Sequence, residues 1–375
     1  MTSIHHIHSF DIPSHLEQVV PQPFSVSLCQ LVGRALIEFT QANKIVIAHS
    51  NQDTDKSILN AFIKGLSEQG ANIIDIGHSN EEQLYFALRH FNADAGALLG
   101  EINTNDVLAL RNFTFLNQKA QVISQANGLH TIWSLATQHN FNCAAVPGSY
   151  QQQDIAQHYL MNIMSILHCL SPKPLHKIKP LKAVIHCQQS ATKLLITHLN
   201  NLFAINRVAI ELIEFKPALS ESYSYALEKE LTAQIKQHKA DIGIAFNQHN
   251  GCEMFDQLGN LITHQQIGHL IGQLLEDKYA TATIVTDNNS HLVNLNHSQV
   301  ALNNQAIVRT MTNSNAIYAA SCTGNHFFQH TGFAPSLLLP WLLTLLAQVR
   351  FEQDLSTLTG QTNNQQPTNV EAISA

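Results

Sequence analysis

Charged residues are scarce in this chain of 375 residues: only 13% are Asp, Glu, Lys or Arg, about half the share in an average soluble domain. Acidic residues outnumber basic ones, 27 against 20. This balance lacks the basic surface with which proteins bind nucleic acid or anionic membranes. Glycine is also infrequent, at 16 residues, where average usage predicts roughly 26. Polarity comes instead from Asn and Gln, about 64 residues together.

Cysteine pairs and long apolar runs are lacking as well. The six cysteines are scattered, with no CxxC pair, a pattern that predicts free thiols in a reducing compartment, namely the cytoplasm. No charged N-terminal segment precedes an apolar stretch, so we expect no secretory signal. The most apolar run, from Pro335 to Val349, is interrupted by Pro340 and is too short to cross a bilayer. It predicts a buried helix.

Apolar residues make up 45% of the chain, which is enough to build folded cores. In the first third, apolar runs typical of strands alternate with amphipathic segments typical of helices. The predicted strands are 44–48, 72–76 and 95–99, and the predicted helices are 53–69 and 81–91. The same order recurs twice downstream, the second time in a shorter form. Such alternation predicts mainly parallel sheets, so we expect an α/β protein with three related units.

Each unit ends with a strand that runs into a polar loop. These loops are Gly100–Asp106, Asn247–Cys252 and Ser321–His326. In open parallel sheets, ligands bind beyond the carboxyl ends of the strands. The three loops are therefore the expected positions of a shared site.

Three segments carry a resemblance to a known family. They are Lys44–Gly96, Ala240–Phe246 (ADIGIAF) and Ser321–Phe328 (SCTGNHFF). Together they resemble the α-D-phosphohexomutases, the phosphomannomutase/phosphoglucomutase family, and the similarity extends in order over residues 10 to 350.

The resemblance implies a fold of tandem α/β domains, each with a mixed, mainly parallel sheet flanked by helices. It divides the chain into domain I at 1–150, domain II at 151–252 and domain III at 253–359. It also implies that the family's fourth, C-terminal domain, which supplies a phosphate clamp, is absent. The Asn/Gln/Thr-rich tail at 360–375 is expected to be disordered.

Family members transfer a phosphoryl group between a phosphoserine and a sugar phosphate. The aligned catalytic loop here contains Gly100, Glu101, Ile102, Asn103 and Thr104, with Ile102 at the serine position. An aliphatic side chain has no hydroxyl and cannot become phosphorylated. Thr104 is a candidate for a displaced nucleophile, but in-line transfer is sensitive to shifts of about 1 Å.

The family's magnesium loop, DGDGDR, is replaced as well. Its three aspartate positions correspond to Asn247, His249 and Gly251. Magnesium prefers charged oxygen ligands, so the resemblance implies that this chain binds no Mg²⁺, and we expect no cofactor. His249 and Cys252 suit zinc better, but two ligands alone more often belong to a polar surface loop.

The sugar-binding loop keeps its outline. It corresponds to residues 320–326, and its candidate substrate contacts are Ser321, Thr323, Gly324 and Asn325. Ser321 stands where the family has a glutamate that binds sugar hydroxyls. Thr323 and Gly324 retain the residue types of the turn.

These losses favour a pseudoenzyme: a phosphomannomutase/phosphoglucomutase-like protein of carbohydrate metabolism with a binding, scaffolding or regulatory role. Two alternatives stay open: a residual or altered phosphohexomutase, and a sugar-phosphate sensor without chemistry. The expected partner is an active phosphohexomutase or another cytoplasmic protein, with neither nucleic acid nor membrane as a ligand. The sequence does not indicate an oligomeric state.

Overall fold

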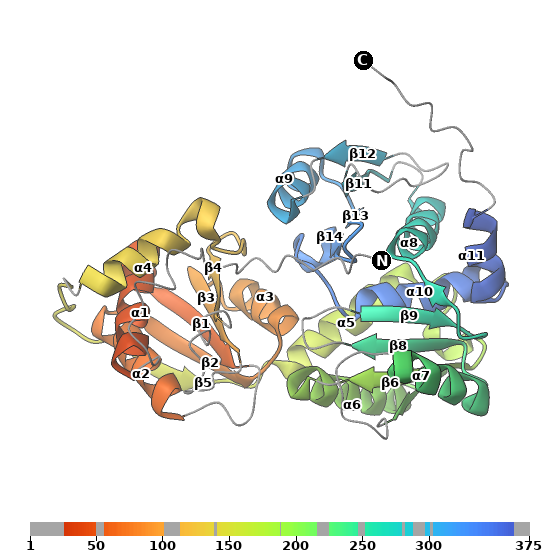
Figure 1. Ribbon diagram of the computed structural model, residues 1–375, viewed down its shortest axis with the longest axis horizontal. Coiled ribbons are helices and arrows are strands. Elements are labelled where there is room, and N and C mark those ends of the chain that lie inside the picture. Colours follow the sequence, from red (N-terminus) through yellow and green to blue (C-terminus); the bar gives the residue numbers. More distant parts are fainter. Residues whose placement is uncertain are drawn as a thin grey trace, which may run out of the picture. The chain divides into compact units, whose positions relative to one another are not determined.

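The computed structural model describes most of the chain between Val26 and Asn363 and shows an α/β fold (Figure 1). The described residues are 26–49, 56–100, 113–138, 141–187, 189–215, 225–246, 252–279, 282–287, 297–300 and 303–363. They form three sheets, two with five strands and one with four, in which parallel pairs predominate. The predicted fold class is therefore confirmed.

The first sheet has the strand order β4-β3-β1-β2-β5, and only β4 runs antiparallel to its neighbour. Helices flank it on both sides (Figure 1). Its strands are β1 (Lys44–His49), β2 (Asn72–His78), β3 (Ala95–Leu99), β4 (Phe113–Asn117) and β5 (Tyr150–Gln152). Its helices are α1 (Val26–Thr40), α2 (Lys56–Glu68), α3 (Glu81–His90) and α4 (Leu129–Gln138).

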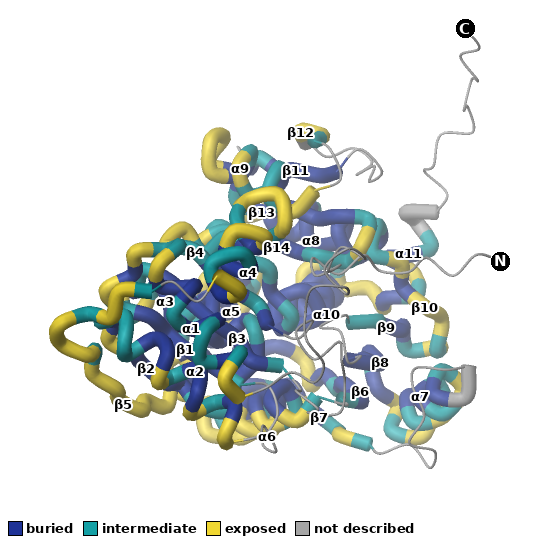
Figure 2. The backbone as a smooth tube through the Cα atoms, turned by 60° about the vertical axis from the view of Figure 1, so that its left-hand side comes forward, coloured by how far each residue is buried: buried dark blue, intermediate teal, exposed yellow. Residues whose placement is uncertain are grey.

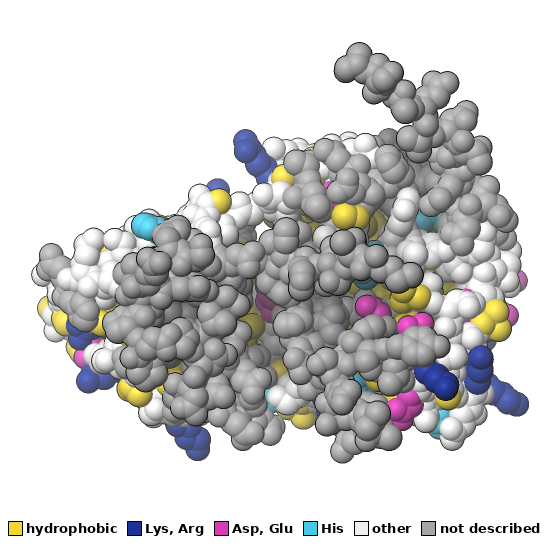
Figure 3. All heavy atoms as spheres, in the orientation of Figure 1, with side chains coloured by type: hydrophobic (Ala, Val, Ile, Leu, Met, Phe, Trp, Pro, Cys, Tyr) yellow, Lys and Arg dark blue, Asp and Glu magenta, His cyan; other side chains and the backbone are white. Residues whose placement is uncertain are grey.

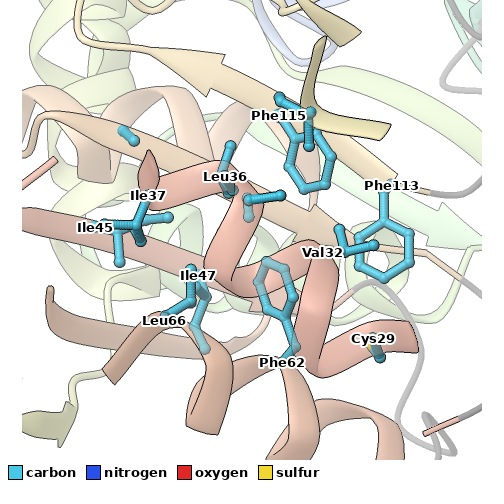
Figure 4. Packing of buried hydrophobic residues seen from close by; sticks show 14 of the residues in the cluster. Cys29, Val32, Leu36, Ile37, Ile45, Ile47, Phe62, Leu66, Phe113 and Phe115 are labelled. Carbon is cyan, nitrogen blue, oxygen red and sulfur yellow. The ribbon is translucent and has the colours of Figure 1, made fainter. Parts of the chain in front are cut away.

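Aliphatic and aromatic side chains together fill the core between this sheet and helices α1 and α2 (Figure 4). Phe62 of α2 is fully buried, and its ring lies 5.6 Å from that of Phe113 and 6.3 Å from that of Phe115. Glycines let the two helices approach closely, because a β-carbon on Gly65 would collide with the backbone of Gln30. The β3 strand is buried along its whole length, as expected for a central strand covered on both faces.

The second sheet has the order β10-β9-β8-β6-β7, with β9 and β10 antiparallel. Its strands are β6 (Leu181–Cys187), β7 (Ile210–Glu214), β8 (Ile242–Phe246), β9 (Cys252–Asp256) and β10 (Leu261–Ile262). Helices α5 (Ala156–Leu170), α6 (Ser190–Ile205) and α7 (Tyr225–His238) belong to this part of the chain.

The third sheet has the order β12-β11-β13-β14, and its last pair is antiparallel. Its strands are β11 (Ile284–Asp287), β12 (His297–Val300), β13 (Tyr318–Ala320) and β14 (His326–Phe328). The helices that follow β10 are α8 (His264–Lys278), α9 (Asn304–Ser314), α10 (Leu339–Phe351) and α11 (Leu355–Asn363).

Helix α10 is the buried helix that the apolar run predicted. Every residue from Leu339 to Val349 is buried, and Figure 2 shows this burial along the helix. Pro340 lies in the first turn, where its missing N–H has no intrahelical partner to lose. Among the described residues, no helix is long and apolar enough to cross a membrane.

Sheet pairing places the unit boundaries differently from the sequence prediction. Strand β5 pairs with β2, so the first sheet extends to Gln152, past residue 150. Strands β9 and β10 pair within the second sheet, which therefore extends to Ile262, past Cys252. Short edge strands and antiparallel returns carry little hydrophobic periodicity, which is why the sequence did not indicate these strands.

The tail also begins later than predicted. Helix α11 continues to Asn363, so residues 360–363 are helical rather than disordered, and residues 364–375 lie outside the described part. By contact density the chain forms two compact units rather than three. The first contains residues up to Tyr159 together with Ser190–Thr192, and the second contains Leu160–Gln189 and the chain from Lys193 onward.

Candidate functional site

Two of the three predicted site loops fall outside the described residues. Gly100 follows β3 directly, but Glu101, Ile102, Asn103 and Thr104 are not described. Strand β3, which ends at Leu99, pairs with the central strand β1.

The candidate metal loop is in the same situation. Asn247, His249 and Gly251 lie outside the described residues, between the end of β8 and Cys252 at the start of β9. Within the part of the chain that is described, no group of three His, Cys, Asp or Glu side chains is arranged to hold a metal ion.

The third loop, residues 320–326, is fully described and forms the tight connection of a β-hairpin. Strands β13 and β14 pair antiparallel, with Ala320 opposite His326. The amide of Ser321 donates to the carbonyl of Asn325 at 2.9 Å, and the amide of Gly324 donates to the carbonyl of Ser321 at 3.1 Å. The loop thus brings Ser321, Thr323, Gly324 and Asn325 together.

The polar side chains of this loop bind one another. The Ser321 and Thr323 hydroxyls lie 2.8 Å apart, and the amide of Asn325 donates to the Ser321 hydroxyl at 3.1 Å. The Asn325 side-chain amide donates to Thr323 Oγ1 at 3.2 Å and to Asn304 Oδ1 at 3.4 Å. The loop therefore presents neutral hydroxyl and amide groups, which suit hydroxyl-bearing ligands better than phosphate.

Position 324 requires glycine for two reasons: its backbone conformation and a neighbouring side chain. Its φ angle is +87°, in the left-handed region that favours glycine. A β-carbon there would lie 2.5 Å from Cε1 of His264, the first residue of α8. The imidazole ring therefore lies directly against the turn.

A buried carboxylate fixes the loop to the neighbouring strand. Asp287, the last residue of β11, is fully buried, and its Oδ2 accepts a hydrogen bond from the amide of Cys322 at 2.7 Å. A charged acceptor makes a stronger bond than a neutral one, so this contact holds the start of the loop firmly.

A buried histidine closes the hairpin. His326 is almost fully buried, and its Nδ1 lies 2.7 Å from the hydroxyl of Tyr318 on the paired strand. Burial lowers the pKa of His326 to about 3, and repulsion from His264 acts in the same direction. The ring is therefore neutral at physiological pH.

Sequence reasoning missed His264, Asn304, Asp287 and the Tyr318–His326 pair. One signal was available: Thr263 and Gln266 form a capping box that starts α8, and the T-x-x-Q spacing marks a helix start. That signal would have placed His264 at a helix N-terminus. Its position against Gly324 depends on tertiary packing, which the local sequence does not encode.

The comparisons with known proteins agree with this architecture. A family model described as "Phosphoglucomutase/phosphomannomutase, alpha/beta/alpha domain I" matches residues 15–100. A phosphomannomutase from Vibrio cholerae is 25% identical over 353 residues, covering 89% of this chain and 74% of that protein. The chain is similar to phosphohexomutases over most of its length.

Solved structures share the phosphohexomutase fold. A phosphoglucomutase/phosphomannomutase family protein from Burkholderia thailandensis superposes with a TM-score of 0.68 at 17% identity, covering 91% of this chain and 77% of its own. The open form of the Paramecium phosphoglucomutase parafusin gives a TM-score of 0.63 at 9% identity, covering 92% of this chain and 72% of its own. At these identities the likeness concerns the fold.

Proposed function

We propose that this phosphohexomutase homologue does not catalyse phosphoryl transfer and acts through binding. The observation that carries the proposal is Ile102, which stands at the family's serine position just after the buried strand β3. Without a hydroxyl or another nucleophilic atom, this side chain forms no phosphoenzyme.

The magnesium chemistry of the family does not fit the donor set either. An amide, an imidazole and a glycine at Asn247, His249 and Gly251 replace three carboxylates, whereas Mg²⁺ is held by carboxylates and phosphate oxygens. These residues therefore do not fit a bound Mg²⁺ ion. On the face shown in Figure 3, the described Lys and Arg side chains stand in separate groups, and a bound phosphate dianion favours clustered donors.

A binding role agrees with what the fold retains. The cores are intact, and the 320–326 loop keeps its hairpin and its hydrogen bonds. The proposed partner is an active phosphohexomutase or another protein of carbohydrate metabolism. None of the six cysteines, all of which lie in the described part of the chain, forms a disulfide, which supports a location in a reducing compartment such as the cytoplasm.

A coupled assay with glucose 1-phosphate and mannose 1-phosphate in the presence of Mg²⁺ tests the loss of activity. We expect no turnover above the protein-free rate. The residual-enzyme alternative requires turnover that disappears in Thr104→Ala, and that result would overturn the proposal. Binding of a purified active phosphomannomutase, measured by calorimetry, tests the partner.

The sugar-phosphate sensor is a second candidate because the 320–326 loop still offers the hydroxyls of Ser321 and Thr323. Ligand at 100 times its Kd stabilises a protein by about 2.7 kcal/mol. A rise in melting temperature with millimolar hexose phosphate, abolished in Thr323→Ala, favours the sensor. An unchanged melting temperature leaves protein binding as the function.

A further inference from the structure

Strand β5 lies at one edge of the first sheet, next to β2 (Figure 1). All three of its residues are exposed, and Figure 2 shows this exposure along the strand. An uncovered edge strand presents a row of backbone N–H and C=O groups to which another strand can pair. The outer edge of β5 is therefore a candidate interaction surface of the first unit.

The hydrogen bonds to β2 show which backbone groups of β5 point outward. The carbonyl of Ser149 accepts a hydrogen bond from β2 at 2.8 Å, and the amide of Gln153 donates one to β2 at 2.9 Å. In a parallel ladder, alternate residues of a strand bond to the same neighbour. Residues 149, 151 and 153 therefore face β2, whereas the N–H and C=O groups of Tyr150 and Gln152 point away from it.

The chain that leads into β5 is fixed to the sheet and to α2. The hydroxyl and the amide of Ser149 both donate to Oδ1 of Asn72, at 2.7 and 3.0 Å, and the Ser67 hydroxyl donates to the carbonyl of Gly148 at 2.8 Å. A β-carbon on Gly148 would collide with the backbone of Ala71, so glycine permits this close approach. The strand is thus ordered before a partner binds, which lowers the entropic cost of association.

One common protection of edge strands is missing at this edge. Natural proteins often place charged side chains there, which prevent pairing with another strand, yet residues 144–153 (AAVPGSYQQQ) contain no charged residue. Within this segment the Val146 side chain is 77% exposed and that of Tyr150 is 45% exposed. The edge is therefore neutral and partly apolar.

The chemistry of this edge matches a second copy of the same edge. A glutamine side chain both donates and accepts through its amide, so the run 151–153 is complementary to itself in an antiparallel pair. The chain has a net charge of −7, so two copies repel each other on average. The neutral edge lets them meet without placing like charges together.

We propose that the outer edge of β5 is a self-association site, at which the β5 strands of two copies pair antiparallel across a twofold axis. In this arrangement Tyr150 of each copy lies opposite Gln152 of the other, and each such pair exchanges two N–H···O=C bonds. Gln151 lies at the axis, opposite the same residue of the second copy. The same surface is used by both copies, as in most homodimers.

The proposal goes beyond the proposed function, because it uses neither the 320–326 loop nor the loops that follow β3 and β8. The contact is expected to be weak. A standard stable interface buries about 800 Å² per partner, and a three-residue strand with two exposed apolar side chains beside it supplies less. We expect a reversible dimer with a dissociation constant on the order of 100 µM.

Sedimentation equilibrium of the full-length protein measures this association. We expect monomers at about 10 µM and mostly dimers at about 1 mM, as mass action requires for this affinity. Hydrogen–deuterium exchange at the same two concentrations locates the contact. The amides of Tyr150 and Gln152 should exchange more slowly at the higher concentration, because pairing gives each amide a carbonyl acceptor.

The variant Gln151→Glu places a carboxylate opposite its own copy at the axis. Like charges directly opposite each other destabilise a strand pair, so the dissociation constant should rise about 5-fold, and added salt should reverse part of this rise by screening. Gln125→Glu is the matched control. It makes the same exchange at an exposed glutamine that follows β4, at the opposite edge of the first sheet, and it should dimerise like the wild type.

The variant Gln152→Pro removes an outward N–H from each copy and leaves the amides that face β2 in place. The dissociation constant should rise by at least about 10-fold, because a hydrogen bond is lost on each side of the axis.

A wild-type protein that stays monomeric at every concentration overturns the proposal. So does a dimer in which exchange at Tyr150 and Gln152 is unchanged, because it must form through another surface. Protection of these amides that appears only when an active phosphomannomutase is added assigns the edge to a different partner and likewise overturns self-pairing. Because the wild-type measurements decide these outcomes, a variant that folds poorly does not obscure the result.

Discussion

The 320–326 loop and the edge between β2 and β5 are each held by a buried carboxylate, but their polar groups are used differently. In the loop, the hydroxyls of Ser321 and Thr323 and the amide of Asn325 bind one another, with a buried carboxylate and a buried histidine beneath them. At the edge between β2 and β5, the exposed Tyr150 side chain donates to the buried carboxylate of Asp75 at 2.7 Å. The difference teaches that a buried carboxylate can anchor a loop through a backbone amide or an edge strand through a side chain.

The largest effect that distinguishes the two regions is expected from acid. Burial lowers the pKa of His326 to about 3, so the unfolded chain, with an ordinary histidine pKa near 6.5, binds the proton first. The neutral His326 ring therefore contributes fully to stability above pH 6.5. As the pH falls from there towards 3, the free energy of unfolding drops by about 1.4 kcal/mol per pH unit. Urea unfolding from pH 8 to pH 4 measures this slope.

The control for the acid effect is His326→Phe. This variant is less stable at pH 8, because the Tyr318 hydroxyl loses its partner. The slope of its unfolding free energy against pH should be smaller, because unfolding no longer involves proton uptake at position 326. An unchanged slope would show that another group controls acid unfolding.

A smaller effect is expected from the turn glycines. Gly324→Ala should lower the free energy of unfolding by about 2 kcal/mol, since it combines a positive φ with a collision against His264. Gly77→Ala, beside His78, is the matched control: its φ is +68°, but no atom lies within 4 Å of the added carbon, so about 1 kcal/mol is expected. Chemical denaturation measures the free energy of unfolding of both variants. Equal losses in the two would contradict tight packing of the loop.

Within the loop, Ser321→Ala should cost about 1 kcal/mol, because the buried hydroxyl accepts from the Asn325 amide. Thr323→Ala, at an exposed position, should change stability by less than about 0.5 kcal/mol. Thermal unfolding compares the two variants. The reverse order would show that ligand contacts rather than packing maintain the loop.

The smallest effect concerns the edge between β2 and β5. Tyr150 donates to the buried Asp75 carboxylate at 2.7 Å, and burial with this hydrogen bond raises the pKa of Tyr150 to about 12. Because the pKa of Tyr150 is higher in the folded protein than in the unfolded chain, the protonated tyrosine contributes fully to stability below pH 10. This contribution is lost as the pH rises towards 12. The melting temperature should fall slightly over that window, and Tyr150→Phe should remove the fall.

The sequence predicted the repeated α/β order because strands such as β1 and helices such as α2 carry clear periodicity. It also predicted the 320–326 turn from its residue types and its likeness to the family. It missed the edge strand β5 and the return strands β9 and β10, which are short. It also missed the position of His264 against Gly324, because residues far apart in the sequence meet there only through folding.

The buried helix α10 has a consequence for synthesis of the protein. A helix that is apolar on every side, with all of Leu339–Val349 buried, has no face suited to water. It lies late in the chain, and it packs against α8, which is made earlier. While the ribosome is still adding residues before Leu339, the apolar surface of α8 lacks this cover. Folding of the second unit is therefore completed late in translation, whereas the first unit can form as soon as its own strands emerge.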